Sequence, residues 1–178
     1  RVYRVNNISR RFCAGEMTVE EAQEELKEIR TNIEYGFLHK CIGYIMTSTF
    51  FAVLFGGNWL DCVAAGVVGL VLALAVTGAS RLRFNDFCQN AAGSFALAVT
   101  ALLIQRLVFF SMNIDAVIIS AIMPMVPGVT FTAAIRDTLN GDYSSGVARI
   151  AEAIVVALGV ASGVGAAMVV FGMMGGGL

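Results

Sequence analysis

A proline-rich break interrupts an uncharged stretch of this sequence, and it is the feature best suited to bind a small polar molecule. The stretch runs from Ala116 to Ile135, and its middle holds Pro124, Pro127 and Gly128. A helix of about twenty apolar residues is long enough to cross the ~30 Å hydrocarbon core of a bilayer. Two prolines and a glycine would divide such a helix into two halves.

The break could expose backbone groups of both signs. Because proline lacks an N–H, we expect the carbonyls of Ser120 and Met123 to lose their usual helical partners. Such carbonyls would suit an ammonium group or a coupling cation, whereas free N–H groups at the start of the second half-helix would suit a carboxylate. We place those N–H groups at Val129, Thr130 and Phe131. A zwitterionic amino acid presents both charges, and many transporters build substrate sites from discontinuous helices.

The same break has a purely structural explanation. An unpaired carbonyl in hydrocarbon costs several kcal/mol, so a break persists only where protein, water or a ligand pairs it. A neighbouring helix could cover the kink between Pro124 and Gly128 without any ligand. Both interpretations stay open at this point.

Charged residues near the ends of the apolar stretches are the next candidates. Arg136 and Asp137 could form a local ion pair that anchors the helix end, or Arg136 could gather an anion at the mouth of a pathway. Arg149 and Glu152 are three residues apart on the next helix and are expected to pair. Alternatively, Glu152 is a candidate for proton coupling, because ionisable residues within membrane spans are often functional.

The composition is that of a membrane protein that spans the bilayer several times. The chain is 57% hydrophobic with a mean hydropathy of +0.76 and is 14% charged, compared with about 25% charged residues in soluble domains. No paired catalytic carboxylates, Ser/His/Asp set or phosphate loop is present, and the one histidine and four cysteines lack metal-ligand spacing. We therefore expect neither an enzyme nor a metal, cofactor or nucleic-acid site, although proton or ion coupling stays open.

The predicted fold is all-α, with a cytoplasmic helical segment before five membrane spans. Residues 1–35 form the segment, which we interpret as the end of a larger N-terminal domain, and its Thr18 and Glu21 have the spacing of a capping box. The transmembrane domain covers residues 36–178, with spans at about 37–55, 60–80, 87–104, 116–135 and 147–174. Glycines at 66, 69, 159 and 163 predict close helix packing.

The distribution of basic residues predicts the orientation. With five spans, eleven of the twelve Lys and Arg residues fall on one side, and only Arg106 falls on the other. Since basic residues concentrate on the cytoplasmic side, we expect a cytoplasmic N-terminus and an external C-terminus in the inner membrane.

Four short motifs together resemble the threonine/serine exporter family, in particular its split five-span subunit. They are Gly56-Gly-Asn-Trp59, Met125-Val-Pro-Gly-Val129, Ala134-Ile-Arg-Asp137 and Gly141-Asp-Tyr-Ser-Ser-Gly-Val-Ala-Arg149. The resemblance implies an inner-membrane exporter of small amino acids or carboxylates, either as one ten-span chain or with a smaller partner subunit. It also implies a cytoplasmic domain before the first span.

Three functions follow as hypotheses. The leading one is export of threonine and serine, with the substrate at the broken fourth helix. A succinate exporter belongs to the same class, and a non-transporting scaffold or accessory subunit belongs to a different one. Because five spans make a small transporter, we also expect the chain to form an oligomer or to bind a partner subunit in the bilayer.

Overall fold

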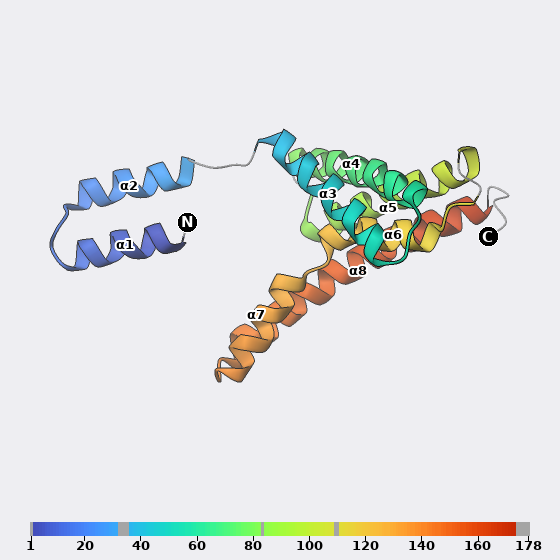
Figure 1. Ribbon diagram of the computed structural model, residues 1–178. Coiled ribbons are helices and arrows are strands. Elements are labelled where there is room, and N and C mark those ends of the chain that lie inside the picture. The colour runs from blue at the N-terminus through green and yellow to red at the C-terminus, as the bar shows by residue number, and fades with distance from the viewer. Residues whose placement is uncertain (1, 32–35, 83, 109–110, 174–178) are drawn as a thin grey trace. The chain divides into compact units, whose positions relative to one another are not determined.

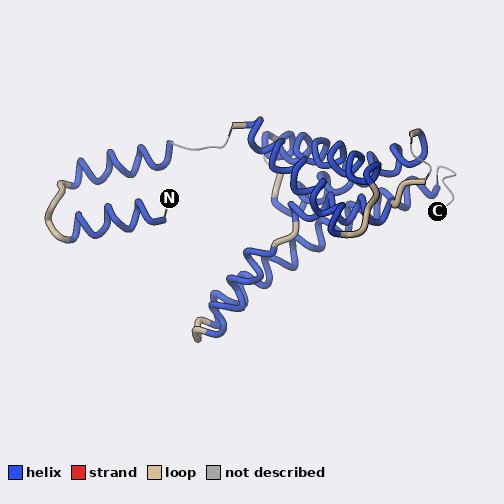
Figure 2. Tube along the Cα trace, in the orientation of Figure 1, coloured by secondary structure: helices blue, strands red, loops and turns tan. Residues whose placement is uncertain are grey.

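The protein is built from helices throughout the residues that its computed structural model describes, which are 2–31, 36–82, 84–108 and 111–173 (Figure 2). Contacts divide the chain into two units, Arg1–Phe37 and Leu38–Leu178. The end of the predicted N-terminal segment at 32–35, and the end of the last predicted span at 174, lie outside the described residues.

The first unit is a pair of helices, α1 (Val2–Cys13) and α2 (Val19–Thr31). Gly15 makes the turn between them with a φ of 74°, a left-handed conformation that glycine adopts without steric cost. The predicted capping box is confirmed, because the Thr18 N–H donates to Glu21 Oε2 at 2.8 Å and the Glu21 N–H donates to Thr18 Oγ1 at 3.3 Å. Ile8, Met17 and Ala22 form the small core of this unit.

The second unit contains the candidate membrane spans. Its helices are α3 (Phe37–Leu54), α4 (Trp59–Arg81), α5 (Asp86–Leu107), α6 (Ile114–Ile122), the 3₁₀ turn η1 (Met123–Met125), α7 (Gly128–Leu139) and α8 (Tyr143–Met173) (Figure 1). Four of them, α3, α4, α5 and α8, are long and apolar enough to span a bilayer. The segments Ile114–Met125 and Gly128–Leu139 form a further, bent pair with an angle of 56°, which agrees with the predicted broken fourth span.

Glycines allow α3 and α4 to approach closely. A Cβ on Gly69 would lie 2.6 Å from Ser48 Oγ and 2.9 Å from the Tyr44 carbonyl oxygen, and one on Gly66 would lie 2.9 Å from Thr49 Oγ1. A larger residue at Gly69 would push the two backbones apart, because one of the atoms it meets is a main-chain oxygen. The close helix packing predicted from Gly66 and Gly69 is confirmed.

The α5 and α8 helices run in the same direction. Gly159 faces Phe87 and Asn90, Gly163 faces Ala91 and Ser94, and Arg106 stacks on the Phe171 ring at 5.7 Å. Contacts near the start of α5 therefore involve earlier residues of α8, and contacts near its end involve later ones, as expected for parallel helices. Between α5 and α8, the segments α6, η1 and α7 therefore lead the chain back toward the end of the bundle at which α5 begins.

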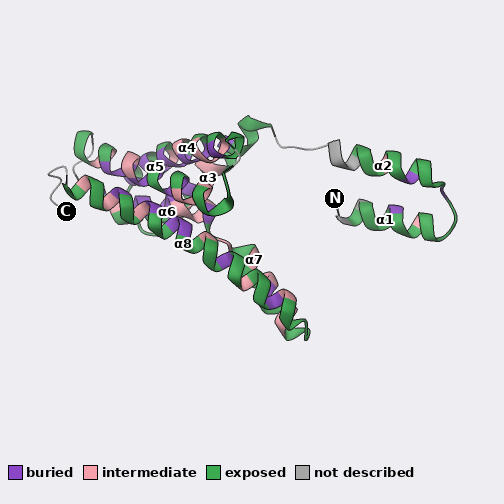
Figure 3. Ribbon diagram, turned by 180° about the vertical axis from the view of Figure 1, so that it is seen from behind, coloured by how far each residue is buried: buried purple, intermediate pink, exposed green. Residues whose placement is uncertain are grey.

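A two-helix hairpin projects from the end of the bundle at which α5 begins (Figure 1). It consists of α7 and the first part of α8, and the chain reverses at Gly141 with a φ of 86°. Gly159 lies sixteen positions after Tyr143, so about 24 Å of α8 precedes its close contact with α5 at Gly159. Figure 3 shows that most residues of this hairpin are exposed.

Candidate functional site

The predicted break lies between α6 and α7, and the backbone there adopts two tight turns. Met123, Pro124 and Met125 form the 3₁₀ turn η1. Pro127 follows with φ −77° and ψ 50°, close to the inverse γ-turn, and the Gly128 N–H donates to the Val126 carbonyl oxygen at 2.8 Å. The side chain of Met125 is buried against Gly93 of α5, which fixes the break to the bundle.

The carbonyls of Ser120 and Met123 lose their usual i+4 partners, which are Pro124 and Pro127, but the expectation that this leaves them unpaired is wrong. The Ser120 carbonyl oxygen accepts the Met123 N–H, and the Met123 carbonyl oxygen accepts the Val126 N–H at 3.2 Å. Each bond spans three residues instead of four, because the 3₁₀ turn tightens the helix end and replaces the donors that proline lacks. Each carbonyl retains only its second lone pair for a ligand.

The start of α7 does carry free backbone donors. Among the described residues, the amides of Val129 and Thr130 have no hydrogen-bond partner, and no side chain caps this helix. Phe131 differs from the expectation, because its N–H donates to the Pro127 carbonyl oxygen at 2.9 Å. Two of the three predicted amides are therefore available to an anion.

The side chains around these amides leave the site open on one side. Val129 is 85% exposed, and an added Cβ on Gly128 would meet nothing within 4 Å. The Thr132 hydroxyl donates to the carbonyls of its own helix, at 3.0 Å to both Gly128 and Val129, whereas the Thr130 hydroxyl has no partner among the described residues. The free amides therefore lie at the end of the projecting hairpin that joins the bundle (Figure 1).

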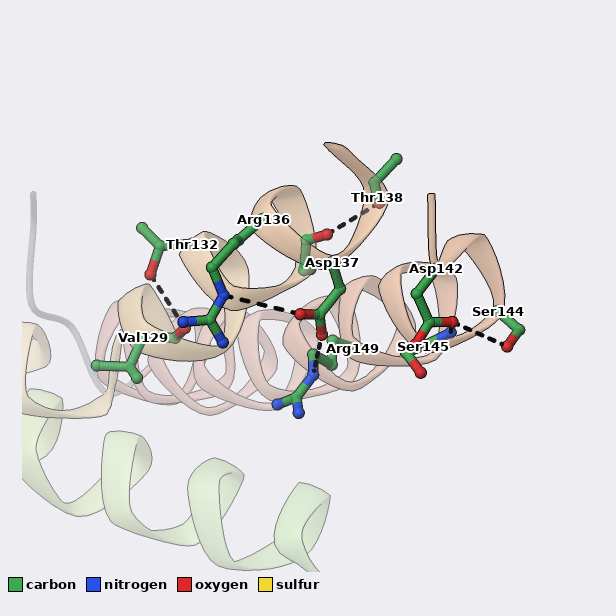
Figure 4. A network of polar contacts seen from close by, with 10 residues as sticks. Val129, Thr132, Arg136, Asp137, Thr138, Asp142, Ser144, Ser145 and Arg149 are labelled. Atoms are coloured by element: carbon green, nitrogen blue, oxygen red, sulfur yellow. Dashed lines mark hydrogen bonds and ion pairs between the residues drawn. The ribbon is translucent and has the colours of Figure 1, made fainter. Parts of the chain in front are cut away.

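An ion cluster joins the two helices of the hairpin (Figure 4). Asp137 Oδ2 lies 2.8 Å from Arg149 Nε, and Asp137 Oδ1 lies 3.8 Å from Arg136 Nε. The predicted pair of Arg136 with Asp137 is present but long. The predicted pair of Arg149 with Glu152 is wrong, since the α7–α8 turn brings Asp137 closer to Arg149 than its own helix neighbour.

The two arginines of this cluster do not share the negative charge of Asp137 equally. Asp137 is mostly buried, with its side chain 18% exposed, while the side chain of Arg136 is 72% exposed. Arg149 neutralises Asp137 at the shorter distance, so the Arg136 guanidinium keeps most of its capacity for another anion. Glu152 is exposed and forms no ion pair within the described part of the chain.

Asp142 immediately precedes α8 at the tip of the hairpin. Its Oδ1 accepts the Ser145 N–H at 3.2 Å and the Ser144 hydroxyl at 3.3 Å, and the hydrogen bonds from Ser145 lower the pKa of this carboxyl below its usual value. Because the pKa of Asp142 is lower in the folded protein than in the unfolded chain, the ionised cap stabilises the fold at pH values above the pKa of the unfolded chain. This stabilisation is lost as the pH falls through the pKa of the folded protein. The cap is therefore intact at neutral pH.

Breaking the α7–α8 ion pair is expected to loosen the hairpin. Arg149→Gln removes the closer partner of a largely buried carboxylate and should destabilise the hairpin by about 1 kcal/mol. Arg136→Gln is the matched control and should have a smaller effect, because its Nε lies 3.8 Å from Asp137. Hydrogen exchange of residues 134–149 measures the difference. Equal exchange in both variants would contradict the assignment of Arg149 as the principal partner.

Asp61 was not among the residues predicted from the sequence, although it is one of the few described polar residues that are buried in the bundle, at 1% exposure. It lies in the first turn of α4, and its carboxylate accepts backbone N–H groups from Asn58 and from Asn113. Its position three residues after Asn58 was a signal for helix capping. The contact with Asn113, 52 residues away, has no signal in the sequence.

Comparison with known proteins identifies the family of this chain. Residues 1–171 match the family model described as "Putative threonine/serine exporter". The chain belongs to this exporter family. A "Threonine/serine exporter" of Corynebacterium glutamicum is 26% identical over 165 residues, which are 90% of this chain and 34% of that protein. A "Probable threonine/serine exporter" of Mycobacterium tuberculosis (strain ATCC 25618 / H37Rv) is 22% identical over 165 residues, covering 92% and 31%.

Membership of the exporter family confirms the resemblance predicted from the motifs and makes the chain part of a transporter family, not an enzyme family. The chain spans about a third of the length of the curated relatives it matches. No solved structure matches. Among the described residues, no three His, Cys, Asp or Glu side chains are grouped so that they could hold a metal ion.

Proposed function

We propose that this chain is one membrane part of a secondary exporter of threonine and serine, and that the substrate carboxylate binds at the start of α7. The observation that carries the proposal is the pair of unpaired amides at Val129 and Thr130. Backbone N–H groups and the helix dipole together favour an anion at a helix N-terminus. The neighbouring Thr130 hydroxyl is available to the side-chain hydroxyl that threonine and serine share.

The remaining predicted residues have subordinate roles in this proposal. The second lone pairs of the Ser120 and Met123 carbonyls would receive the substrate ammonium, and Pro124 and Pro127 would hold the break open. Gly128 leaves space beside the carboxylate, since an added Cβ would meet nothing within 4 Å. Arg136 would gather substrate at the predicted cytoplasmic mouth, with Asp137 held by Arg149, and Glu152 is the candidate for proton coupling.

We further propose that a second membrane part completes the site. The start of α7 is exposed on one side, and the relatives are about three times as long as the matched region. A smaller partner subunit or a second copy of this chain would cover the open side. In this proposal the N-terminus is cytoplasmic and the C-terminus lies outside the inner membrane, an orientation supported by the distribution of basic residues.

Efflux from vesicles tests the proposed function. The chain is reconstituted with the membrane proteins that co-purify with it, the vesicles are loaded with threonine, serine or succinate, and efflux is followed with and without a proton gradient. We expect efflux of threonine and serine. Absence of efflux for all three substrates under both conditions would contradict the proposal and favour a scaffold, a function that the paired carbonyls at the break would also allow.

The same assay separates the two candidate substrate classes. Arg136→Ala removes the most exposed guanidinium of the hairpin cluster, and a dianion depends on such a charge more than a zwitterion does. If the natural substrate is threonine or serine, its efflux should fall by less than about tenfold, in line with the loss of one exposed charge contact. Arg106→Ala at the other end of the bundle is the matched control. A much larger loss confined to succinate efflux would favour the dicarboxylate alternative.

A further inference from the structure

The α6 helix is tied to the rest of the bundle at its first residues. Asp61 Oδ1 accepts the Asn113 N–H at 3.0 Å, and Asp61 Oδ2 accepts the Asn58 N–H at 2.8 Å. Asn113 is the residue immediately before α6, and its own side chain accepts the Ala116 N–H at 3.2 Å. One carboxylate therefore joins the turn between α3 and α4 to the start of the broken helix.

The surroundings of Asp61 show that this contact is built into the fold. The residue is 1% exposed, and no Lys or Arg pairs with it within the described part of the chain. Its charge is stabilised instead by two backbone N–H groups and by its place in the first turn of α4. A Cβ on Gly57 would lie 3.1 Å from Asp61 Cβ and 2.8 Å from the Ala52 carbonyl oxygen, so Gly57 leaves the space that the carboxylate needs.

The α6 helix connects the residues held by Asp61 to the break. It is only nine residues long, and its opposite end is η1, which contacts Gly93 of α5 through Met125. Five of its residues are buried, so it can slide or tilt only if one end is released. Gln105 of α5 adds a weaker tie near the same end, with its side-chain N–H₂ donating to the Met112 carbonyl oxygen at 3.4 Å.

We propose that Asp61 is a positioning residue, which fixes the start of α6 through the Asn113 N–H and thereby sets the position of the break. The transport consequence rests on the proposed function, whereas the structural consequence does not. Asp61 would not touch substrate, because it lies at the opposite end of α6 from Pro124 and Gly128.

Three variants test the proposal by hydrogen exchange of residues 114–120 in the full chain. Asp61→Ala removes the acceptor. Asn113→Pro removes the N–H donor at a residue whose φ of −79° suits proline, and Asn113→Ala is its matched control, since it loses the same side-chain cap but keeps the N–H. Loss of a hydrogen bond to a charged group should speed exchange about ten- to a hundredfold.

The expected pattern is faster exchange in Asp61→Ala, and faster exchange in Asn113→Pro than in Asn113→Ala. Adding Asp61→Ala to Asn113→Pro should cause no further increase at residues 114–120, because the bond between Asp61 and Asn113 is already lost. The bond from Asn58, which Asp61→Ala also removes, lies in the turn before α4. Equal exchange in the two Asn113 variants, or additive effects in the double variant, would overturn the proposal even if Asp61→Ala alone proved too unstable to study.

Transport kinetics separate a positioning role from simple loss of stability. The threonine concentration for half-maximal export should rise by a similar factor in Asp61→Ala and Asn113→Pro, and less in Asn113→Ala, at matched amounts of folded protein. An unchanged half-saturating concentration in both would overturn the transport consequence. Absence of export by the unsubstituted protein would instead contradict the proposed function and leave the exchange result to decide on Asp61.

Discussion

Replacing Gly128 with leucine is expected to reduce threonine export about a hundredfold without reducing the amount of folded protein. A Cβ at Gly128 would meet no atom within 4 Å, and its φ is not in the left-handed region, so the fold accommodates a side chain. The leucine would occupy the open space beside the Val129 and Thr130 amides. Misplacing a substrate by about 1 Å can cost a hundredfold in rate.

The matched control for this change is Gly165→Leu on α8. An added Cβ there also meets nothing within 4 Å, and the residue lies far along the chain from the break. Export measured in reconstituted vesicles should be unchanged in this variant. Full export by Gly128→Leu, with protein levels equal to those of the control, would mean that the break does not bind substrate.

Replacing Gly163 with leucine is expected to prevent the bundle from assembling. The added side chain would overlap with Ser94 Oγ and with the Ala91 carbonyl oxygen, and its Cβ would lie 2.9 Å from the Phe95 nitrogen. Two of these atoms are main chain, so only separation of α5 from α8 can relieve the overlap. Overpacking costs about 1–3 kcal/mol where side chains can adjust, and the cost should be at least at the upper end of this range here.

Size-exclusion chromatography in detergent and the thermal unfolding midpoint measure this second effect. Gly165→Leu again serves as the control, since it adds the same side chain to the same helix on a face with open space. A Gly163→Leu protein that elutes as a single species and unfolds at the temperature of the control would contradict the close packing of α5 against α8.

Most of the fold could be predicted from local patterns in the sequence. The predicted limits of the first three spans differ from α3, α4 and α5 by only a few residues at each end, because runs of apolar residues and the turn at Gly56 are properties of neighbouring residues. The Gly159 and Gly163 contact was predictable for the same reason. The start of α8 was not, since residues 143–146 precede the predicted span and extend a helix that packs against α7.

The position of the candidate site could be predicted from the sequence, but its hydrogen bonds and ion pairs could not. The two prolines predicted where the helix breaks. The 3₁₀ turn at Met123, which pairs the carbonyls of Ser120 and Met123, depends on the backbone conformation at the break. The choice of Asp137 over Glu152 by Arg149, and the contact of Asp61 with Asn113, join helices far apart in sequence. Such contacts depend on helix packing, which a single sequence does not encode as a local pattern.

Protection of a single cysteine by substrate tests the central claim most directly. Val129→Cys, in a chain whose four native cysteines are replaced by serine, places a thiol beside the free amides at a position that is 85% exposed. Leu139→Cys, at a position 81% exposed near the far end of the same helix, is the matched control. We predict that saturating threonine slows thiol labelling at position 129 and leaves it unchanged at 139. Equal labelling rates with and without threonine at both positions, in protein that exports threonine, would contradict a substrate site at the start of α7.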